Sequence, residues 1–238
     1  MKLVGERRAL AAVVFAFYAL IYSMIAFSGM VPDFNKAFFA LAAVYGLAMF
    51  SLVAGYFWAR WYSVGVGLYG VITAAVGMWQ IGAEPILFFV GGTHLAAALM
   101  LWGETMSESY DGQTAWREKL HMDEGAVQRL GRSVIRAGVS LPFVLLYALA
   151  PKPGGAELVV GMAALLLAGL GLRALVRLRT WGVLAIGGAG VLMVAMSIGE
   201  MASHADAYAL RPALAGALLI SASMPWVAPA LRFLRLAR

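Results

Sequence analysis

The sequence predicts an all-α fold, a polytopic transmembrane helix bundle of eight spans with both termini in the cytoplasm. Three observations lead to this prediction: the composition, the length of the apolar runs and the placement of the positive charges. Hydrophobic residues make up 63% of the 238 positions and charged residues only 13%, whereas an ordinary soluble domain has roughly 25% charged residues. A chain of this composition is expected to lie in a bilayer.

The apolar runs are long enough to cross a membrane. About 20 helical residues, each rising about 1.5 Å, span a hydrocarbon core of about 30 Å. Barrel strands would instead alternate in polarity over segments of about ten residues, so the continuous runs here predict helices. The expected spans cover residues 9–30, 38–58, 63–82, 86–103, 133–150, 158–178, 181–201 and 213–231.

In the first half of the chain, short turn-forming segments separate the spans. Lys2, Arg7 and Arg8 precede the first run, which is longer than the roughly 7–15 residue apolar core of a signal peptide and is expected to be retained. The segment VPDFNKA follows this run, ARWY precedes the third span, and AEP precedes the fourth. VPDFNKA and AEP contain Pro and polar residues that are typical of turns.

The longest polar segment divides the chain into two apolar parts. We expect residues 1–103 to form a first four-helix membrane half, residues 104–132 a cytoplasmic polar loop, and residues 133–238 a second four-helix half. PKPGGAE and HADAYALRP separate spans in the second half. Kinks are expected at the prolines inside the fifth and eighth spans, which are Pro142, Pro225 and Pro229.

The positive charges follow the alternation that this topology requires. Short cytoplasmic loops of membrane proteins are enriched in Lys and Arg. With the N-terminus inside, all but three of the 18 Lys and Arg residues fall on the cytoplasmic side, the exceptions being Lys36, Lys152 and Arg211. The sequence therefore predicts a multi-pass protein of a cell inner or plasma membrane, and its many Arg, Ala and Gly residues indicate a bacterial chain.

Features that recur about half a chain apart raise the question of an internal duplication. Met100 with Trp102 is matched by Met224 with Trp226. Parallel repeats of this kind are known in transporters. However, a repeated topology alone places arginine and tryptophan at corresponding membrane boundaries, so a true duplication and a repeated topology both remain open.

His94 is the ionisable residue nearest the middle of a predicted span. A charge at that depth costs at least about 2.5–3.5 kcal/mol, so such residues often mark a functional site. Val90, Gly91, Ala97 and Ala98 share its helix face, and small residues favour close packing against another helix. One hypothesis is a cofactor-binding residue, ligating haem or a chlorin, or a proton relay. The alternative is a neutral imidazole bonded to a hydroxyl or carbonyl on a neighbouring helix.

A second constellation, Glu200, His204 and Asp206, follows the seventh span. Glu200 and His204 share a face if the helix continues past Met201. Two carboxylates and an imidazole are ligands that zinc or manganese accepts, and Glu84 is a further candidate. The spacing matches no strong metal signature, so a divalent metal is the less favoured hypothesis and solvated polar groups at a helix exit the more common explanation.

The polar loop contains a predicted surface helix, QTAWREKLHMDE, with Trp116 and Leu120 one turn apart. Residues 104–132 carry six acidic and four basic side chains, a poor composition for binding anionic headgroups. A partner-binding site through Trp116 and Leu120 and a solvated connector both fit.

Several classes of site are excluded. The absence of cysteine excludes disulfides, thiolate metal sites and cysteine nucleophiles. GVGLYG and GGAG resemble nucleotide-binding motifs, but a phosphate-binding loop needs a preceding strand and an aqueous helix start. These glycines therefore predict close helix packing. The positive charges lie at membrane boundaries, so nucleic acid is not an expected partner despite a pI near 9.8.

The favoured function is a non-catalytic integral membrane subunit with a scaffold or assembly role in a larger membrane protein complex. Its predicted partners are the lipid bilayer and other membrane protein subunits, and the aromatic-rich first half would face one of them. The first alternative is a small transporter or channel for an uncharged or weakly charged solute, and the second is a haem- or pigment-binding subunit through His94. A transport path would be lined by hydroxyls, namely those of Ser23, Ser51, Thr73, Thr93, Ser140, Ser221 and Ser223.

Overall fold

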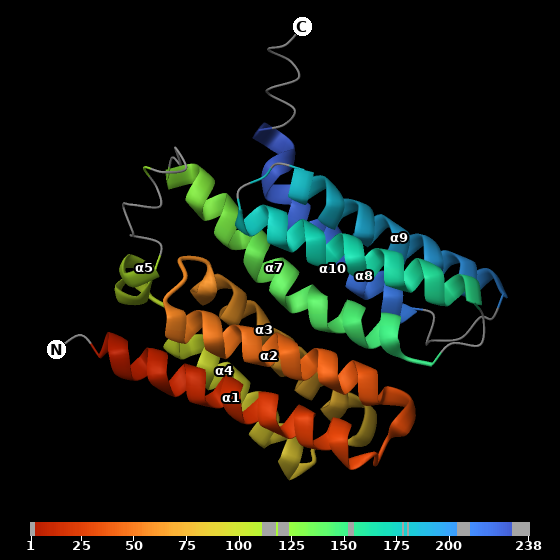
Figure 1. Cartoon of the computed structure of the whole chain (residues 1–238), viewed down its shortest axis with the longest axis horizontal. Coiled ribbons are helices and arrows are strands. Elements are labelled where there is room, and N and C mark those ends of the chain that lie inside the picture. Colours follow the sequence, from red (N-terminus) through yellow and green to blue (C-terminus); the bar gives the residue numbers. More distant parts are fainter. Residues whose placement is uncertain are drawn as a thin grey trace, which may run out of the picture. The chain divides into compact units, whose positions relative to one another are not determined.

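All regular elements in the described part of the chain are helices, which confirms the all-α prediction (Figure 1). This computed structural model describes residues 3–110, 118, 124–151, 155–177, 179, 181–203 and 210–229. The contacts divide the chain into two compact units, unit 1 (Met1–His121) and unit 2 (Met122–Arg238). The division falls within the predicted polar loop.

Unit 1 is an up-and-down bundle. Its long helices pack in a ring in chain order, and the fourth returns to contact the first (Figure 1). Short connections of this kind place consecutive helices antiparallel. The described elements are α1 (Val4–Ser28), η1 (Pro32–Phe34), α2 (Asn35–Ala54), α3 (Ala59–Ile81), α4 (Pro85–Met100) and α5 (Glu104–Tyr110).

Specific turn residues fix the ends of these helices. Gly29 follows α1 and Gly55 follows α2, with φ of 65° and 72° respectively. Residues other than glycine rarely adopt this left-handed backbone conformation, which ends a helix. Pro85 occupies the first turn of α4, where its missing N–H costs no hydrogen bond. The predicted spans of unit 1 therefore begin and end within a few residues of the observed helices.

The helix of the fourth predicted span is the shortest of the four long helices in unit 1. Residues 86–103 were expected to cross the membrane, but α4 ends at Met100 and has 16 residues, which reach only about 24 Å. Beyond Gly103, which has φ 107°, the helix α5 lies at 69° to α4. In the described residues seven helices are long and apolar enough to cross a membrane, or eight if α4 and α5 form one bent span. The predicted multi-pass helical bundle is therefore confirmed.

Unit 2 repeats the ring arrangement of unit 1. Each long helix packs on the next, and α10 contacts α7. The transition from α10 to a 3₁₀ turn occurs at Met224, one residue before Pro225, where a kink was expected. In contrast, α7 continues through Pro142. The described elements are α7 (Glu124–Leu149), α8 (Gly155–Val176), α9 (Trp181–Ser203), α10 (Leu210–Ser223) and η3 (Met224–Trp226).

The helix α7 begins earlier than its predicted span. It starts at Glu124, whereas the span was expected from residue 133. Val127, Leu130 and Val134 are buried and recur at helical spacing on one face. The first turns of α7 are therefore amphipathic, and a prediction based on unbroken apolar runs assigns such a segment to a loop.

Glycines bring the helices of unit 2 into backbone contact. A Cβ atom added at Gly182 of α9 would lie 2.6 Å from the carbonyl oxygen of Gly171 in α8, and one added at Gly190 would lie 2.7 Å from the carbonyl oxygen of Gly216 in α10. Small residues permit this approach in membranes, where packing replaces the hydrophobic effect as the driving force. The packing role predicted for the GGAG glycines is thus confirmed at Gly190. Gly188, in the same motif, would meet no atom within 4 Å.

We predict that Gly190→Ala destabilises unit 2 and that Gly188→Ala does not. The new Cβ at position 190 would collide with backbone atoms of α10, and relieving such overpacking costs about 1–3 kcal/mol. Thermal unfolding of the purified protein in detergent measures the difference. Equal midpoints for the two variants would contradict the α9–α10 contact.

Candidate functional site

His94 lies inside the helix bundle of unit 1. Its side chain is 0% exposed and packs directly on Gly70 of α3, where an added Cβ would lie 1.9 Å from His94 Cδ2. Next to this contact, a Cβ at Gly67 would lie 3.1 Å from Ala98, and one at Gly91 would lie 3.1 Å from Ala74. The predicted small-residue face of α4 therefore packs against another helix, and the imidazole occupies space that a side chain at position 70 would need.

The partners of the imidazole define its tautomer. Nδ1 lies 2.8 Å from the carbonyl oxygen of Val90, one turn earlier in α4. A carbonyl oxygen can only accept, so Nδ1 carries the proton. Nε2 lies 2.7 Å from the hydroxyl of Tyr45 in α2. In a neutral imidazole this nitrogen is the acceptor, so Tyr45 donates to it.

A parallel chain of hydrogen bonds starts at Tyr18 of α1. Its hydroxyl lies 2.7 Å from Thr93 Oγ1, and the Thr93 hydroxyl donates to the carbonyl oxygen of Phe89 at 2.7 Å. Because Thr93 has a single proton, Tyr18 is the donor to Thr93. Both chains therefore begin at a tyrosine on another helix and end at a backbone carbonyl of α4.

The rings of these residues form one cluster. The ring centroids of Tyr18 and His94 are 4.1 Å apart, those of Tyr18 and Tyr45 are 5.6 Å apart, and those of Tyr22 and Tyr45 are 5.4 Å apart. We define the tyrosine–histidine cluster as Tyr18, Tyr22, Tyr45, Thr93 and His94. It joins α1, α2 and α4 near the middle of each helix, and α3 contributes the glycine beneath the imidazole.

Sequence reasoning identified His94 and missed the tyrosines. The aromatic residues of the first half were assigned to an outward surface, yet Tyr18 and Tyr45 are 4% and 0% exposed. One signal was available, because Tyr18 and Tyr22 are four residues apart and therefore share a face of α1. That Tyr45 meets this face at the level of His94 depends on helix rotation, which the spacing does not reveal.

The cluster binds helices together through neutral groups. The geometry matches the alternative interpretation of His94, a neutral imidazole bonded to a hydroxyl on a neighbouring helix. An axial ligand for haem or a chlorin would need a free ring nitrogen, and Tyr45 would have to leave Nε2 to provide one. Cofactor binding at His94 and a proton relay remain hypotheses.

Arginines connect the helix ends of unit 1. Arg7 of α1 donates to the carbonyl oxygen of Trp102, just beyond α4, at 2.6 Å, and Arg8 donates to the carbonyl oxygen of Val53 in the last turn of α2. Carbonyls at a helix C-terminus lack helical partners and carry the negative end of the helix dipole. The arginines predicted at a membrane boundary therefore also cap helices.

Unit 2 uses the same kind of connection. Arg136 of α7 donates to the carbonyl oxygen of Ser221 in α10 at 2.6 Å. The guanidinium of Arg129 lies 5.8 Å from the ring centroid of Trp226, and the indole N–H of Trp226 donates to Ser133 Oγ at 2.9 Å. In both units, arginine from the first helix contacts the end of the fourth.

Of the predicted metal constellation, only Glu200 can be placed. It lies on α9 and accepts a hydrogen bond from the Tyr147 hydroxyl of α7. His204 and Asp206 lie outside the described residues, and Glu84 is an exposed residue of unit 1. In the described part of the chain, no three His, Asp or Glu side chains gather where they could hold a metal. Metal binding by the three residues stays a prediction.

The predicted partner-binding residues of the polar loop, Trp116 and Leu120, also lie outside the described residues.

Comparisons of the chain with family models, with curated proteins and with solved structures found no match.

We predict that Tyr45→Phe lowers the thermal stability of the protein more than Tyr18→Phe does. Removing the Tyr45 hydroxyl leaves the buried Nε2 of His94 without a donor, which costs about 1–3 kcal/mol. Removing the Tyr18 hydroxyl leaves Thr93 still donating to Phe89. Unfolding in detergent measures both variants, and the loss in Tyr45→Phe should shrink when His94 is replaced by Leu. A larger loss in Tyr18→Phe would contradict the assigned hydrogen-bond directions.

Proposed function

We propose that the protein is a non-catalytic integral membrane subunit with a scaffold or assembly role in a larger complex of a bacterial inner membrane, with both termini in the cytoplasm. The observation that carries this proposal is the closed hydrogen bonding of the tyrosine–histidine cluster. Each of its two hydrogen-bond chains starts at a tyrosine of α1 or α2 and ends at a backbone carbonyl of α4. These bonds hold α1, α2 and α4 together. A catalytic or transport site needs polar groups that converge on a substrate, whereas these groups converge on one another.

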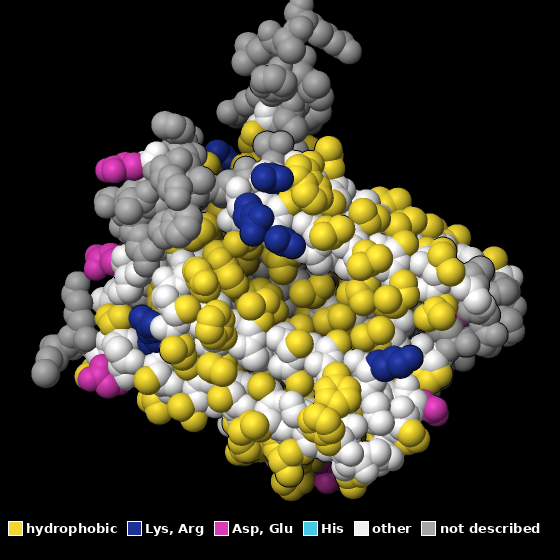
Figure 2. Space-filling view, in the orientation of Figure 1, with side chains coloured by type: hydrophobic (Ala, Val, Ile, Leu, Met, Phe, Trp, Pro, Cys, Tyr) yellow, Lys and Arg dark blue, Asp and Glu magenta, His cyan; other side chains and the backbone are white. Residues whose placement is uncertain are grey.

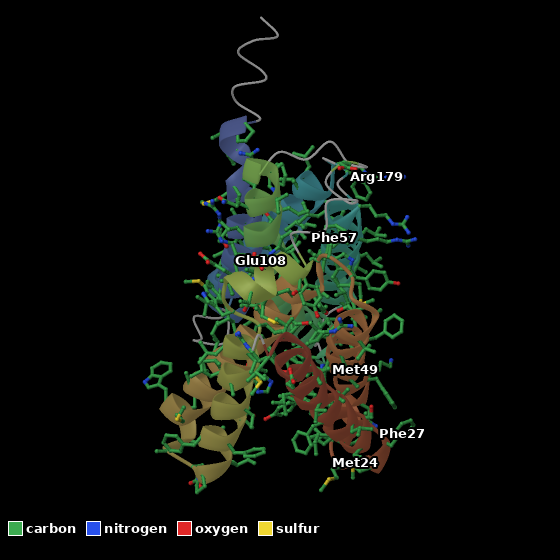
Figure 3. All side chains as sticks on the ribbon, turned by 90° about the vertical axis from the view of Figure 1, so that its left-hand side faces the viewer. Met24, Phe27, Met49, Phe57, Glu108 and Arg179 are labelled. Atoms are coloured by element: carbon green, nitrogen blue, oxygen red, sulfur yellow. The ribbon has the colours of Figure 1, made fainter. Side chains whose placement is uncertain are left out.

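The outward surface of unit 1 supports a role in protein association. Aromatic and methionine side chains are enriched at protein interfaces, whereas a lipid-facing surface needs only to be apolar. Near the end of α1, Met24 and Phe27 project from the bundle, 67% and 79% exposed (Figure 3). The exposed aromatic residues described in unit 1 are Phe17, Phe27, Phe39, Phe50, Tyr56, Trp79, Phe88, Phe89 and Trp102.

The corresponding surface of unit 2 is aliphatic. Its large exposed apolar side chains are mainly Leu, Val, Ile and Met, with Trp181 an aromatic exception among the described residues. Lipid would cover this surface as well as any protein. The proposed contacts with other membrane subunits therefore involve unit 1.

We predict that other membrane protein chains co-purify with the protein in mild detergent and that Trp79→Leu/Phe88→Leu reduces their recovery. Both side chains are exposed, 86% and 58%, so these changes should leave the thermal stability of the protein itself unaltered. Leu184→Val/Val191→Leu is the matched control, since it exchanges two exposed apolar residues of unit 2. Quantitative mass spectrometry after cross-linking measures the recovery.

Three results would contradict this proposal. Recovery of the wild-type protein as a monodisperse monomer would remove the need for a complex. Equal losses of partner chains in both double variants would show that the aromatic surface has no special role. A purified sample that absorbs visible light, and loses the band in His94→Leu, would support the haem or pigment alternative.

The second candidate is a small transporter for an uncharged or weakly charged solute. The observation that favours it is the matching ring of helices in the two units, with an arginine from each first helix bound near the end of the fourth. Parallel repeats of helices are a known transporter design.

The hydroxyls expected to line a path give this candidate little support. Ser23, Ser140 and Ser221 each donate to a carbonyl oxygen one turn earlier in their own helix, as do Ser51, Thr93 and Ser223. Hydroxyls bonded in this way serve the local helix. Their protons are therefore not available to bond a solute.

If the protein were a transporter, liposomes containing it would swell faster in uncharged solutes such as glycerol or urea than protein-free liposomes. We expect equal rates, because six of the seven hydroxyls expected to line a path already donate to carbonyl oxygens of their own helices. Stopped-flow light scattering measures the swelling. Faster swelling that Thr93→Val abolishes would favour transport over the scaffold role.

A further inference from the structure

Three arginines are exposed where α8 ends and α9 begins. Arg173 lies in the last turn of α8 and Arg177 directly follows this helix, its N–H donating to the carbonyl oxygen of Arg173 at 3.2 Å. Arg179 comes two residues later, and all three side chains are exposed. Figure 2 shows Lys and Arg side chains gathered at this turn, and Figure 3 labels Arg179 at the end of these helices. We define the arginine patch as Arg173, Arg177 and Arg179.

The backbone fixes the third arginine beside the other two. The Arg179 N–H donates to the carbonyl oxygen of Ala174 at 2.9 Å, and the Gly182 N–H donates to the carbonyl oxygen of Arg179 at 3.0 Å. The close contact of Gly171 with Gly182 holds α8 and α9 together just below this turn. The backbone of the α8–α9 connection therefore fixes the position of Arg179 in the arginine patch.

The arginine patch lies far from the acidic side chains described in unit 2. Glu157 starts α8 and Glu200 is near the end of α9, so each is separated from the patch by more than about 20 Å of helix. Charges separated by more than a Debye length of about 8 Å are largely screened. The three guanidinium groups therefore repel one another without compensation from these acids, and an added anion would relieve the repulsion.

The depth of the patch selects the kind of anion. Arg173 lies inside the apolar segment Glu157–Val176, and Trp181, at the start of α9, is 46% exposed. Tryptophan prefers the membrane interface, and an arginine one turn inside a span extends its side chain toward the headgroups. These guanidinium groups thus lie at the level of lipid phosphates, with which they form bidentate hydrogen bonds.

We propose that the arginine patch is a binding site for the phosphate headgroup of an anionic phospholipid. Basic pockets at the ends of transmembrane helices bind such headgroups, and each arginine near the surface contributes about 1 kcal/mol. The site requires only that unit 2 spans a membrane, so it does not depend on the proposed scaffold role.

The test measures binding of phosphatidylglycerol to the full-length protein in a neutral detergent, by native mass spectrometry and by the rise in unfolding temperature. Phosphatidylcholine with the same acyl chains is the lipid control. We expect binding to weaken about fivefold for each arginine removed, so Arg177→Gln should weaken it and Arg173→Gln/Arg177→Gln/Arg179→Gln nearly abolish it. Lys36→Gln, which removes an exposed charge from unit 1, should have no effect.

Further measurements distinguish a lipid ligand from other anions, and a loss of binding from misfolding of the variants. The triple Lys variant of the same positions keeps the charges and should retain most of the preference. A photoreactive phosphatidylglycerol should cross-link to residues 173–181 of the wild-type protein, whatever the stability of the variants. Unchanged binding in the triple Gln variant, cross-links only elsewhere, or equal protection by inorganic phosphate or by an acidic peptide would overturn the proposal.

Discussion

The structure depends on one constraint: polar groups that are buried in a hydrocarbon environment must find partners inside the protein. An unsatisfied backbone or side-chain group in lipid costs several kcal/mol. Helices satisfy the backbone, but the interior of unit 1 also contains tyrosine hydroxyls, a threonine and an imidazole. The threonine donates to the carbonyl oxygen of Phe89, and the imidazole donates to that of Val90. The constraint thus sets the rotation of α1 and α2 about α4.

The two units meet the same packing problem with different residues. In unit 1, large aromatic rings fill the centre, and Gly70 provides the room for one of them. In unit 2, glycines at 182 and 190 allow α9 to touch the backbones of α8 and α10. Association of helices in lipid relies on van der Waals contact and hydrogen bonds. Large interlocking rings supply the van der Waals contact in unit 1, and close backbone contacts supply it in unit 2. This difference follows the uneven distribution of aromatic residues along the chain.

Arginines have distinct roles according to their place in the fold. Arg7, Arg8 and Arg136 reach across to carbonyl oxygens of another helix, where they neutralise the negative end of a helix dipole. Arg173 in the last turn of α8 and Arg177 just beyond it are exposed. A single rule, the segregation of positive charge to membrane boundaries, predicts the position of both groups. It does not distinguish arginines that stabilise the bundle from those that are available to a lipid.

The sequence by itself determined the helical membrane class, the approximate limits of most spans and the burial of His94, because hydropathy and glycine spacing are local properties of the chain. It missed the break at Gly103 that separates α4 from α5. It also missed the start of α7, where the helix has one apolar face instead of a continuous run. Only the tertiary structure decided that Tyr45 donates to His94 and Tyr18 to Thr93. Such pairs depend on how far each helix is rotated and shifted against its neighbours, and that is set by the packing of all four helices together.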